Sequence, residues 1–370
     1  MEAARFPVQR IAVRLVEGID GTLMVIIAAL TLLGFAALFS ASYETPGRVA
    51  SQLMHLSLAL MAMWVTAQIP PQTLMRFALP AYVVGIVLLV GVALFGDVVN
   101  GARRWLHVGV TRFQPSEMMK LALPLMLAWY FHRRESSLSL RDFAFAAVLL
   151  IIPFGLIVRQ PDLGTAALVG AAGFYVIFFA GISWRLLGGV AALFLIALFP
   201  LWGLLHDYQR KRVLTLLDPT SDPLGAGYHI IQSTIAVGSG GIPGKGWLNG
   251  TQAHLEFIPE RHTDFIFAVY SEEFGLIGNI VLLVLYGLLI GRGLVIAANA
   301  ATLFARLMAG SVTLMFFTYA FVNMGMVSGI LPVVGVPLPF LSYGGTALLT
   351  LFIGVGILMS VQRHRKLVQT

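Results

Sequence analysis

Charged side chains that could do chemistry are concentrated in three stretches of this 370-residue chain. In the first stretch, Arg103 and Arg104 precede Glu117 and Lys120, which are three residues apart and share one face of a helix that begins at Pro115. This spacing suits two structures equally well. One is an ion pair at the start of a helix, and the other is a charged wall inside the cavity of a helix bundle.

The second stretch, Gln160-Pro-Asp-Leu-Gly-Thr165, also predicts the start of a helix, with Pro161 as its first residue. Asp162 would then complement the helix dipole, and this structural role explains it better than a functional one when the stretch is taken alone. However, two helix starts at one membrane face, each with a carboxylate, favour a shared site.

The third stretch is the long polar segment 206–263, which contains Arg210, Lys245 and Arg261. Its glycine-rich part, 238–246, is not a Walker A loop, because glycine follows Lys245 where that motif requires Ser or Thr. Backbone amides in such a stretch could bind phosphate, but a flexible turn is the simpler interpretation.

Asp264 stands where this segment meets a long apolar run that begins at Phe265. A carboxylate at such a boundary loses part of its hydration, which raises its pKa toward the range of a general base. A helix cap is the alternative role. Farther along the run, Glu272 and Glu273 are costly inside a membrane and should face the interior of the bundle.

The stretch 331–345 cannot form a continuous helix, because it contains three prolines and a Gly-Gly pair. A broken or re-entrant segment is tolerated in a membrane only where it is buried in protein or lines a cavity. Ser342 lies in this stretch, which we therefore expect to form a further wall of the same site.

The elements that position these residues must be apolar. Hydrophobic residues make up 58% of the chain and charged residues 11%, whereas a globular protein carries about 25% charged residues. This composition excludes a soluble two-domain enzyme, a coiled coil and a disordered chain. Ten runs are long enough to span a bilayer, namely 21–41, 51–69, 77–96, 115–131, 143–158, 162–181, 185–205, 264–291, 306–328 and 340–361.

The expected fold class is therefore all-α, a polytopic membrane protein in which residues 1–370 form a single integral membrane domain with ten transmembrane helices. Of the arginines and lysines, 13 lie on the side of the termini and 11 on the other side. Five of these 11 lie in the segment 206–263, and long segments carry less weight in the positive-inside rule. Both termini are thus expected in the cytoplasm, with 206–263 as a large outer loop between spans seven and eight.

Absent residue types exclude several kinds of chemistry. The chain has no cysteine, which rules out disulfides, thiolate metal sites and cysteine nucleophiles. It also lacks a His-Glu-x-x-His motif, a nucleophile elbow and a nucleotide-binding motif, so neither protease chemistry nor ATP hydrolysis is expected. A substrate that reaches its site through the lipid is the remaining option.

Taken together, these motifs resemble those of the SEDS family of bacterial shape, elongation, division and sporulation proteins, over essentially the whole chain. The segment from Glu260 to Asp264, Glu-Arg-His-Thr-Asp, fits the elongation members better than the division members. The motifs that carry the resemblance are Arg112-Phe-Gln-Pro-Ser-Glu117 with Lys120, Gln160-Pro-Asp-Leu-Gly-Thr165, Tyr228-His-Ile-Ile-Gln-Ser233, Gly238-Ser-Gly-Gly241, Pro259-Glu-Arg-His-Thr-Asp-Phe-Ile-Phe-Ala268 and Pro339-Phe-Leu-Ser-Tyr-Gly-Gly345.

The resemblance implies a ten-span peptidoglycan glycosyltransferase of the cell inner membrane that polymerises lipid II on the periplasmic face, for cell-wall elongation and rod shape. The implied partners are the elongation-specific class B penicillin-binding protein, which is a transpeptidase, and the MreC and MreD proteins of the rod complex. Asp264 matches the family's essential aspartate, while Glu117, Lys120 and Asp162 match charged residues of its central cavity.

Such a transfer needs one base and a cationic surrounding for the leaving group. The donor sugar is α-linked to pyrophosphate and the product is β-linked, so one inverting displacement suffices, with Asp264 as the base for the 4-hydroxyl of the acceptor. Basic side chains, or a divalent cation such as Mg²⁺ or Mn²⁺, would stabilise the leaving pyrophosphate. The expected substrate-binding residues are Arg103, Arg104, Glu117, Lys120, Asp162, Arg210, Lys245, Arg261 and Ser342.

Two alternative functions use the same cavity. A lipid II flippase would also need charged groups inside the bundle, but the polar residues gather on one face and no inverted repeat is visible, which favours the enzyme. A scaffold that only positions the transpeptidase is the other alternative.

Overall fold

The computed structural model describes residues 18–43, 45, 47–99, 102–108, 111–136, 138–204, 207–221, 225–255, 257–258 and 260–365. The parts of the termini that contribute to the expected orientation, 1–17 and 366–370, lie outside the described residues. The described helices are α2 (Gly21–Ala41), α3 (Gly47–Gln68), α4 (Pro71–Arg76), α5 (Ala78–Phe95), α6 (Pro115–Arg133), α7 (Leu140–Arg159), α8 (Leu163–Phe179), α9 (Trp184–Leu204), α10 (Asp207–Leu217), η1 (Pro219–Ser221), α11 (Ala226–Ser239), α12 (Thr251–His254), α13 (Ile266–Ala298), α14 (Leu303–Val327) and α15 (Gly345–Arg363).

Each of the ten predicted spans coincides with one of these helices. Seven helices of the described chain are long and apolar enough to cross a membrane, namely α2, α3, α5, α7, α13, α14 and α15. The other three expected spans correspond to α6, which carries charged residues, and to α8 and α9, whose apolar parts are shorter. The nearly all-helical architecture is thus confirmed, whereas the count of ten crossings stays a prediction.

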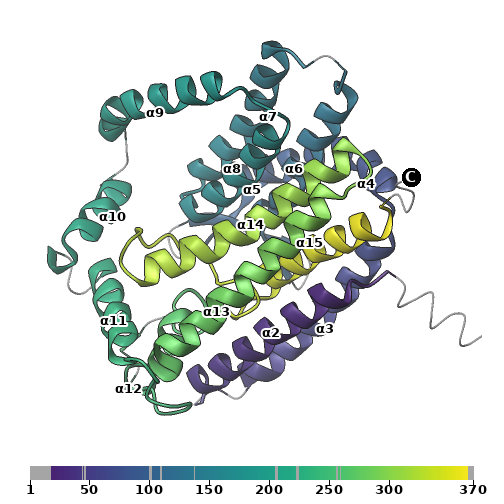
Figure 1. Cartoon of the computed structure of the whole chain (residues 1–370). Coiled ribbons are helices and arrows are strands. Elements are labelled where there is room, and N and C mark those ends of the chain that lie inside the picture. The colour runs from purple at the N-terminus through teal and green to yellow at the C-terminus, as the bar shows by residue number, and fades with distance from the viewer. Residues whose placement is uncertain are drawn as a thin grey trace, which may run out of the picture.

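The helices pack side by side around α14, with α9 at the edge. α14 contacts α13, α8, α6 and α15, and α15 in turn lies along α3 (Figure 1). By contrast, α9 has no buried residue among those described and stands away from the bundle (Figure 1). After α9, the helices α10 and α11 lead the chain back along one side of the bundle (Figure 1). The core that can hold a precise site therefore lies among α6, α8, α13 and α14.

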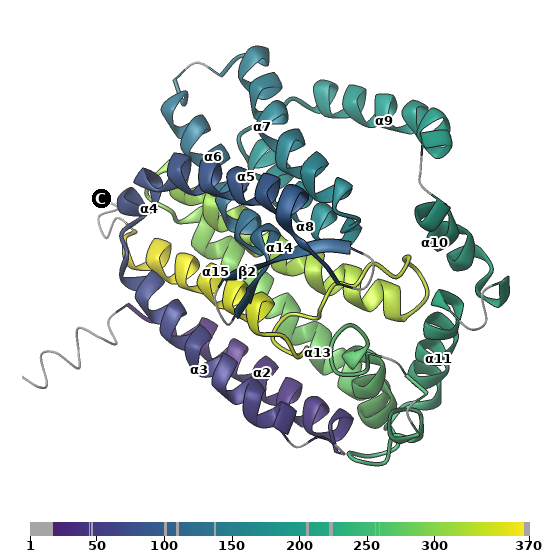
Figure 2. The same cartoon turned by 180° about the vertical axis from the view of Figure 1, so that it is seen from behind.

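The segment that follows α5 is a small antiparallel sheet, which the all-α prediction missed. Strands β1 (Asp97–Val99), β2 (Ala102–Val108) and β3 (Thr111–Phe113) form a meander in the order β1-β2-β3. Its sequence is rich in Val, Thr and aromatic residues, which favour strands, and pairing satisfies the backbone without a helix. The meander packs against α5 and α6 and is visible from behind in Figure 2.

A sharp kink divides α13 at Gly275, which has φ 63° and ψ −159°. The glycine-rich loop lies against this kink and exchanges backbone hydrogen bonds with it. Lys245 N and Gly246 N donate to the carbonyls of Glu272 and Glu273 at 3.0 Å each, while Leu276 N and Ile277 N donate to the carbonyls of Gly241 and Ile242 at 2.9 and 3.2 Å. A Cβ on Gly275 would meet the backbone nitrogen of Gly244 at 2.3 Å. The loop is thus the partner of a broken helix and not the free turn that the sequence predicted.

Candidate active site

The start of α6 places an ion pair inside the bundle. Pro115 is the first residue of the helix, as predicted, and Glu117 and Lys120 are buried. Lys120 Nζ lies 2.5 Å from Glu117 Oε1 and also donates to the hydroxyl of Tyr319 in α14 at 2.5 Å. Both predicted structures are therefore present, because the ion pair of the helix start also faces the interior.

Glu117 also borders an apolar cavity of about 390 Å³ between α3, α5, α6 and α15. Its second oxygen, Oε2, is buried and has no hydrogen-bond partner among the described residues. The lining is otherwise made of apolar side chains and threonines, such as Leu121, Leu125, Thr350 and Ile353. One carboxylate oxygen at the wall of an apolar cavity is the only charged group that this cavity offers in the described chain.

The start of α8 differs from the prediction. The helix begins at Leu163, so Pro161 is not its first residue, and Asp162 is the N-cap, whose Oδ1 accepts a hydrogen bond from Thr165 N at 3.1 Å. Aspartate is a strong N-cap and moved the helix start past the proline. Its other oxygen, Oδ2, accepts from Gln114 Nε2 at 3.0 Å, which joins the starts of α6 and α8.

Of the two neighbouring arginines of β2, one points toward the starts of α6 and α8 and the other toward the outside. Arg104 Nη2 donates to the carbonyl of Pro161 at 2.6 Å, and its Nε is buried without a hydrogen-bond partner among the described residues. Arg103 is exposed, since neighbouring residues of a strand point to opposite faces. The structure therefore brings Arg104, but not Arg103, to the starts of α6 and α8.

Asp264 lies two residues before α13 and does not cap it, so the alternative role as a helix cap is wrong. The residue at the N-cap position is Phe265. Asn323 Nδ2 from α14 donates to the backbone carbonyl of Asp264 at 2.8 Å and to that of Val336 at 2.7 Å. A Cβ on Gly335 would lie 3.2 Å from Asp264 Oδ2, so the backbone passes close to the carboxylate.

The carboxylate of Asp264 itself makes no hydrogen bond or ion pair with the part of the chain that the structure describes. Burial, together with the nearby carboxylates of Glu260 and Asp162 and against the opposing charge of Arg104, raises its pKa from the ordinary 3.8 to about 6. Asp264 is half-buried. The raised pKa agrees with the partial loss of hydration that the sequence predicts for Asp264, while its role as a base stays a prediction.

The segment 328–344 between α14 and α15 is non-helical, as its prolines and glycines predict, and it holds the turn before Asp264. Ser342 Oγ donates to the carbonyl of Thr263 at 2.6 Å and accepts from Leu338 N at 2.8 Å. Arg261 Nε donates to the carbonyl of Ala41 at 3.0 Å. Ser342 and Arg261 therefore fasten the segment that carries Asp264.

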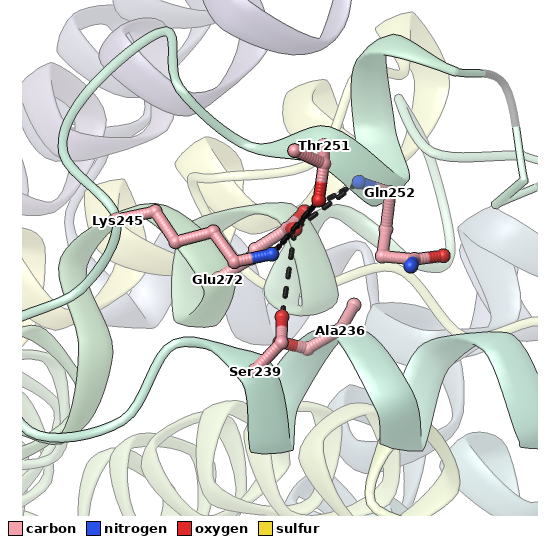
Figure 3. A network of polar contacts seen from close by, with 6 residues as sticks. All are labelled: Ala236, Ser239, Lys245, Thr251, Gln252 and Glu272. Atoms are coloured by element: carbon pink, nitrogen blue, oxygen red, sulfur yellow. Dashed lines mark hydrogen bonds and ion pairs between the residues drawn. The ribbon is translucent and has the colours of Figure 1, made fainter.

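Besides Arg103, two of the predicted substrate-binding residues, Lys245 and Arg210, lie elsewhere. Lys245 Nζ lies 2.6 Å from Glu272 Oε1, within the network of Figure 3. Arg210 belongs to α10, and its Nη2 donates to the carbonyl of Gly203 in α9 at 2.6 Å. Neither is among the charges that act on Asp264, so their contact with substrate stays a prediction.

Three residues at the site were not predicted from the sequence, namely Gln114, Tyr319 and Asn323. Gln114 stands directly before the proline that begins α6, and its amide links Ser116 and Asp162. Tyr319 and Asn323 are polar side chains inside the apolar run 306–328. A polar side chain is costly within such a run unless it has a buried partner, and this cost was the signal that could have found them.

The described residues do not fit a resident metal site. No three of the described His, Asp and Glu residues come together as metal ligands. Both oxygens of Asp162 already accept hydrogen bonds. Mg²⁺ can be held by one or two carboxylates together with substrate phosphates, so the expected divalent cation stays a prediction, and no step below runs through it.

Comparison with known proteins gives consistent matches over nearly the whole chain. A family model described as cell cycle protein, FtsW/RodA/SpoVE, matches residues 21–367. The peptidoglycan glycosyltransferase MrdB of Escherichia coli (strain K12) is 54% identical, over 94% of this chain and 95% of its own length. The peptidoglycan glycosyltransferase RodA of Treponema pallidum is 33% identical, over 95% of this chain and 99% of its own.

Solved structures have the same fold. A chain from a peptidoglycan synthase complex, in a study of how polymerization and crosslinking are coordinated, matches with a TM-score of 0.82 at 38% identity, over 94% of this chain and 99% of that chain. The rod shape determining protein RodA of Thermus thermophilus matches with a TM-score of 0.72 at 32% identity, over 94% and 97% of the two chains.

Proposed function

The chain belongs to the FtsW/RodA/SpoVE family of cell cycle proteins, the SEDS family that its motifs indicate, and we propose that it is a peptidoglycan glycosyltransferase with Asp264 as the general base. Relatives that span nearly all of the chain are named for this activity. The predicted similarity to RodA, the elongation member, agrees with the RodA match in structure.

The proposed reaction is a single inverting displacement on lipid II. Asp264 takes the proton of the acceptor's 4-hydroxyl, and that oxygen forms a bond to the anomeric carbon of the donor sugar. The bond between this carbon and the pyrophosphate oxygen breaks, and the lipid-linked pyrophosphate leaves with the electron pair. The α-linked donor thereby becomes a β-linked glycan, and one carboxylate is enough to carry the proton.

One observation carries the choice of Asp264. Glu117 holds Lys120, and Asp162 caps α8 and accepts from Gln114, so both are engaged by other groups. Asp264 is the carboxylate at this place that makes no hydrogen bond or ion pair with described residues, and its pKa is raised to about 6. A general base needs a free lone pair and a pKa close to the working pH.

Arg104 is the basic residue best placed for the leaving pyrophosphate. It acts electrostatically on Asp264, and its buried Nε has no hydrogen-bond partner among the described residues, so one donor is available for a phosphate oxygen. Lys120 adds positive charge deeper in the bundle, where its ammonium already serves Glu117 and Tyr319. Arg103, Arg210, Lys245 and Arg261 are the weaker candidates.

The setting proposed for this reaction is the periplasmic face of the cell inner membrane, with ten spans and both termini in the cytoplasm. The contacts from Arg104 to Pro161 and from Gln114 to Asp162 join the starts of α6 and α8 at one place. Arg104 and Asp162 also act electrostatically on Asp264, so the start of α13 lies near the starts of α6 and α8. A membrane enzyme with its charges at one end would meet lipid II there.

The proposed partner is the elongation-specific class B penicillin-binding protein. The support is the match to a chain from a peptidoglycan synthase complex that coordinates polymerization and crosslinking. MreC and MreD of the rod complex are proposed as further partners, on the strength of the RodA resemblance.

The test is polymerisation of lipid II by the purified chain in detergent. We expect glycan from the wild type and almost none from Asp264→Asn, while Glu135→Gln on the surface leaves the rate unchanged. Glycan formed at the wild-type rate by Asp264→Asn would refute the role of Asp264. Because detergent offers no bilayer to cross, a flippase would form no glycan, and a scaffold would form none with or without its transpeptidase.

A further inference from the structure

A buried carboxylate outside the candidate site, Glu272, anchors the glycine-rich loop and has no part in the proposed chemistry. Glu272 is 0% exposed and lies before the Gly275 kink, in residues 266–274, the part of α13 called its first half below. Its Oε1 accepts hydrogen bonds from Lys245 Nζ at 2.6 Å, Thr251 Oγ1 at 3.1 Å and the backbone nitrogen of Gln252 at 3.1 Å, and Ser239 Oγ at the end of α11 lies 3.5 Å away. Figure 3 shows these groups converging on the one carboxylate from three sides.

The same loop is joined to α13 through the backbone. The four hydrogen bonds exchanged at the Gly275 kink tie the segment 241–246 to the residues on both sides of the kink. A Cβ on Gly240 would meet the carbonyl oxygen of Ser271 at 2.2 Å, and one on Gly244 would meet that of Glu273 at 2.1 Å. The loop therefore lies in direct contact with the first half of α13.

α11 connects this anchor with the residue next to Asp264. The ring of His229, near the start of α11, stacks on Phe265 with the centroids 5.5 Å apart and the planes at 17°. Ser239, at the other end of α11, reaches Glu272. α11, the loop and the first half of α13 thus form one unit that begins directly after Asp264.

The backbone around Asp264 is held on two sides, by Ser342, Arg261 and Asn323 before and at the residue and by this unit directly after it. Asp264 makes no hydrogen bond or ion pair with described residues through its carboxylate, and Asn323 holds only its backbone carbonyl. No partner of the side chain itself can therefore correct a shift at the start of α13. A displacement of about 1 Å at a reacting group can cost about 100-fold in rate.

We propose that Glu272 is a positioning residue for Asp264. By holding Lys245 and the loop against the first half of α13, it fixes the helix start from which the carboxylate of Asp264 points. Glu272 is fully buried while the Lys245 side chain is 28% exposed, and a buried carboxylate is costly to leave without its cation even where the pair adds little net stability, which suits a residue kept for geometry. The inference rests on the proposed role of Asp264 as the base.

The experiment compares lipid II polymerisation by the purified full chain in detergent for Lys245→Met, Glu272→Gln and the double variant. Lys245→Met leaves a buried carboxylate without its cation, and we expect kcat to fall about 10- to 100-fold with KM unchanged. In the double variant no charge is buried alone, and the amide oxygen that Glu272→Gln introduces can still accept from Thr251, so we expect kcat to recover at least tenfold over Lys245→Met. Arg134→Met, which removes an exposed partner of the buried Asp142, is the matched control and should leave kcat unchanged.

Three results would overturn the inference. The first is an unchanged kcat in both single variants. The second is a higher KM in Lys245→Met that the double variant does not restore. The third is a loss of kcat that matches the fraction of unfolded protein in thermal unfolding of the same samples. The second result would make Lys245 a substrate contact instead. Asp264→Asn is measured in parallel: if it is inactive while the Glu272 variants are normal, the proposed function stands and only the positioning role falls.

Discussion

Three carboxylates of the described chain, Glu117, Glu272 and Asp264, have two different kinds of surroundings. Glu117 and Glu272 each lie beside a lysine ammonium, at 2.5 Å from Lys120 and 2.6 Å from Lys245. Asp264 has no cation within ion-pair distance in the described chain, and Arg104 acts on it only from farther away. The two groups lie in one bundle, and Glu272 is in the very helix that follows Asp264.

The presence or absence of a cation beside the carboxylate distinguishes a structural role from a catalytic one. A carboxylate beside a lysine ammonium has at least one oxygen engaged in an ion pair, and removing the ammonium is costly where the carboxylate is buried. A carboxylate left without a partner is destabilised as an ion, so its pKa rises and it can take up a proton near neutral pH. The absence of a partner for Asp264 is thus what makes it suitable as a base.

The largest effect is expected from Asp264→Asn, which should separate activity from stability. Loss of the base should lower the polymerisation rate by about 10²- to 10⁴-fold. Because burial raises the pKa of Asp264, the ionised form is less stable in the folded chain than in the unfolded one, so a neutral Asn should leave the unfolding temperature unchanged or higher. Rates on lipid II and thermal unfolding in detergent measure both, and a clearly lower unfolding temperature would contradict the comparison.

Lys120→Met, unlike Asp264→Asn, should lower the stability of the fold. The substitution leaves Glu117 buried without its cation, which typically costs about 3–5 kcal/mol. The free energy of unfolding in detergent measures the cost. A second variant, Lys120→Met with Glu117→Gln, should recover most of it, since no charge then remains buried. A loss below about 1 kcal/mol in the single variant would place Glu117 with Asp264 and not with Glu272.

The pH dependence of the wild-type rate should report the unpartnered carboxylate. A base with a pKa of about 6 is ionised above that pH and protonated below it, so kcat/KM should be level above pH 6 and fall about tenfold for each unit below. Glu260→Gln should shift the midpoint to lower pH, because the charge of Glu260 helps to raise the pKa of Asp264. A level profile down to pH 4.5 would show that Asp264 has an ordinary pKa.

The smallest effect is expected from an exposed carboxylate. Glu135 lies 3.3 Å from His132, and its side chain is 58% exposed. Surface pairs are worth about 0–1 kcal/mol, so Glu135→Gln should change neither the unfolding free energy by more than that nor the polymerisation rate. A larger loss would mean that burial does not distinguish the carboxylates of this protein.

Features that depend on neighbouring residues were predictable from the sequence. Most apolar runs became helices within a few residues of the expected bounds, although α13 continues to Ala298, past the expected end at 291. Pro115 began α6 with Glu117 and Lys120 on one face. The prolines of 331–345 prevented a helix there. Glu272 and Glu273 are buried in the bundle as their cost in a membrane requires.

Features that depend on residues far away in the sequence could not be predicted. The strands after α5 and the kink partner of the glycine-rich loop both satisfy backbone groups through pairing that short-range patterns do not contain. Pro161 was displaced from the helix start by the capping side chain of Asp162, whose second oxygen is held by Gln114 from another helix. A competition between two good helix-start residues is decided by such contacts.

The sequence by itself therefore determined which segments are apolar, where helices begin or break, and that Asp264 stands at a boundary, because these follow from the preferences of adjacent residues. The spacing of Glu117 and Lys120 also predicted their ion pair. Only the tertiary structure decided that Lys245 pairs with Glu272 and that Asp264 has no cation within ion-pair distance among the described residues. Tyr319 reaches Lys120 from 199 residues away, and Lys245 reaches Glu272 from 27. Ion pairs between residues that are far apart in the sequence depend on how the chain folds. The proposed reactivity of Asp264 depends on the lack of a cation beside its carboxylate in the described chain.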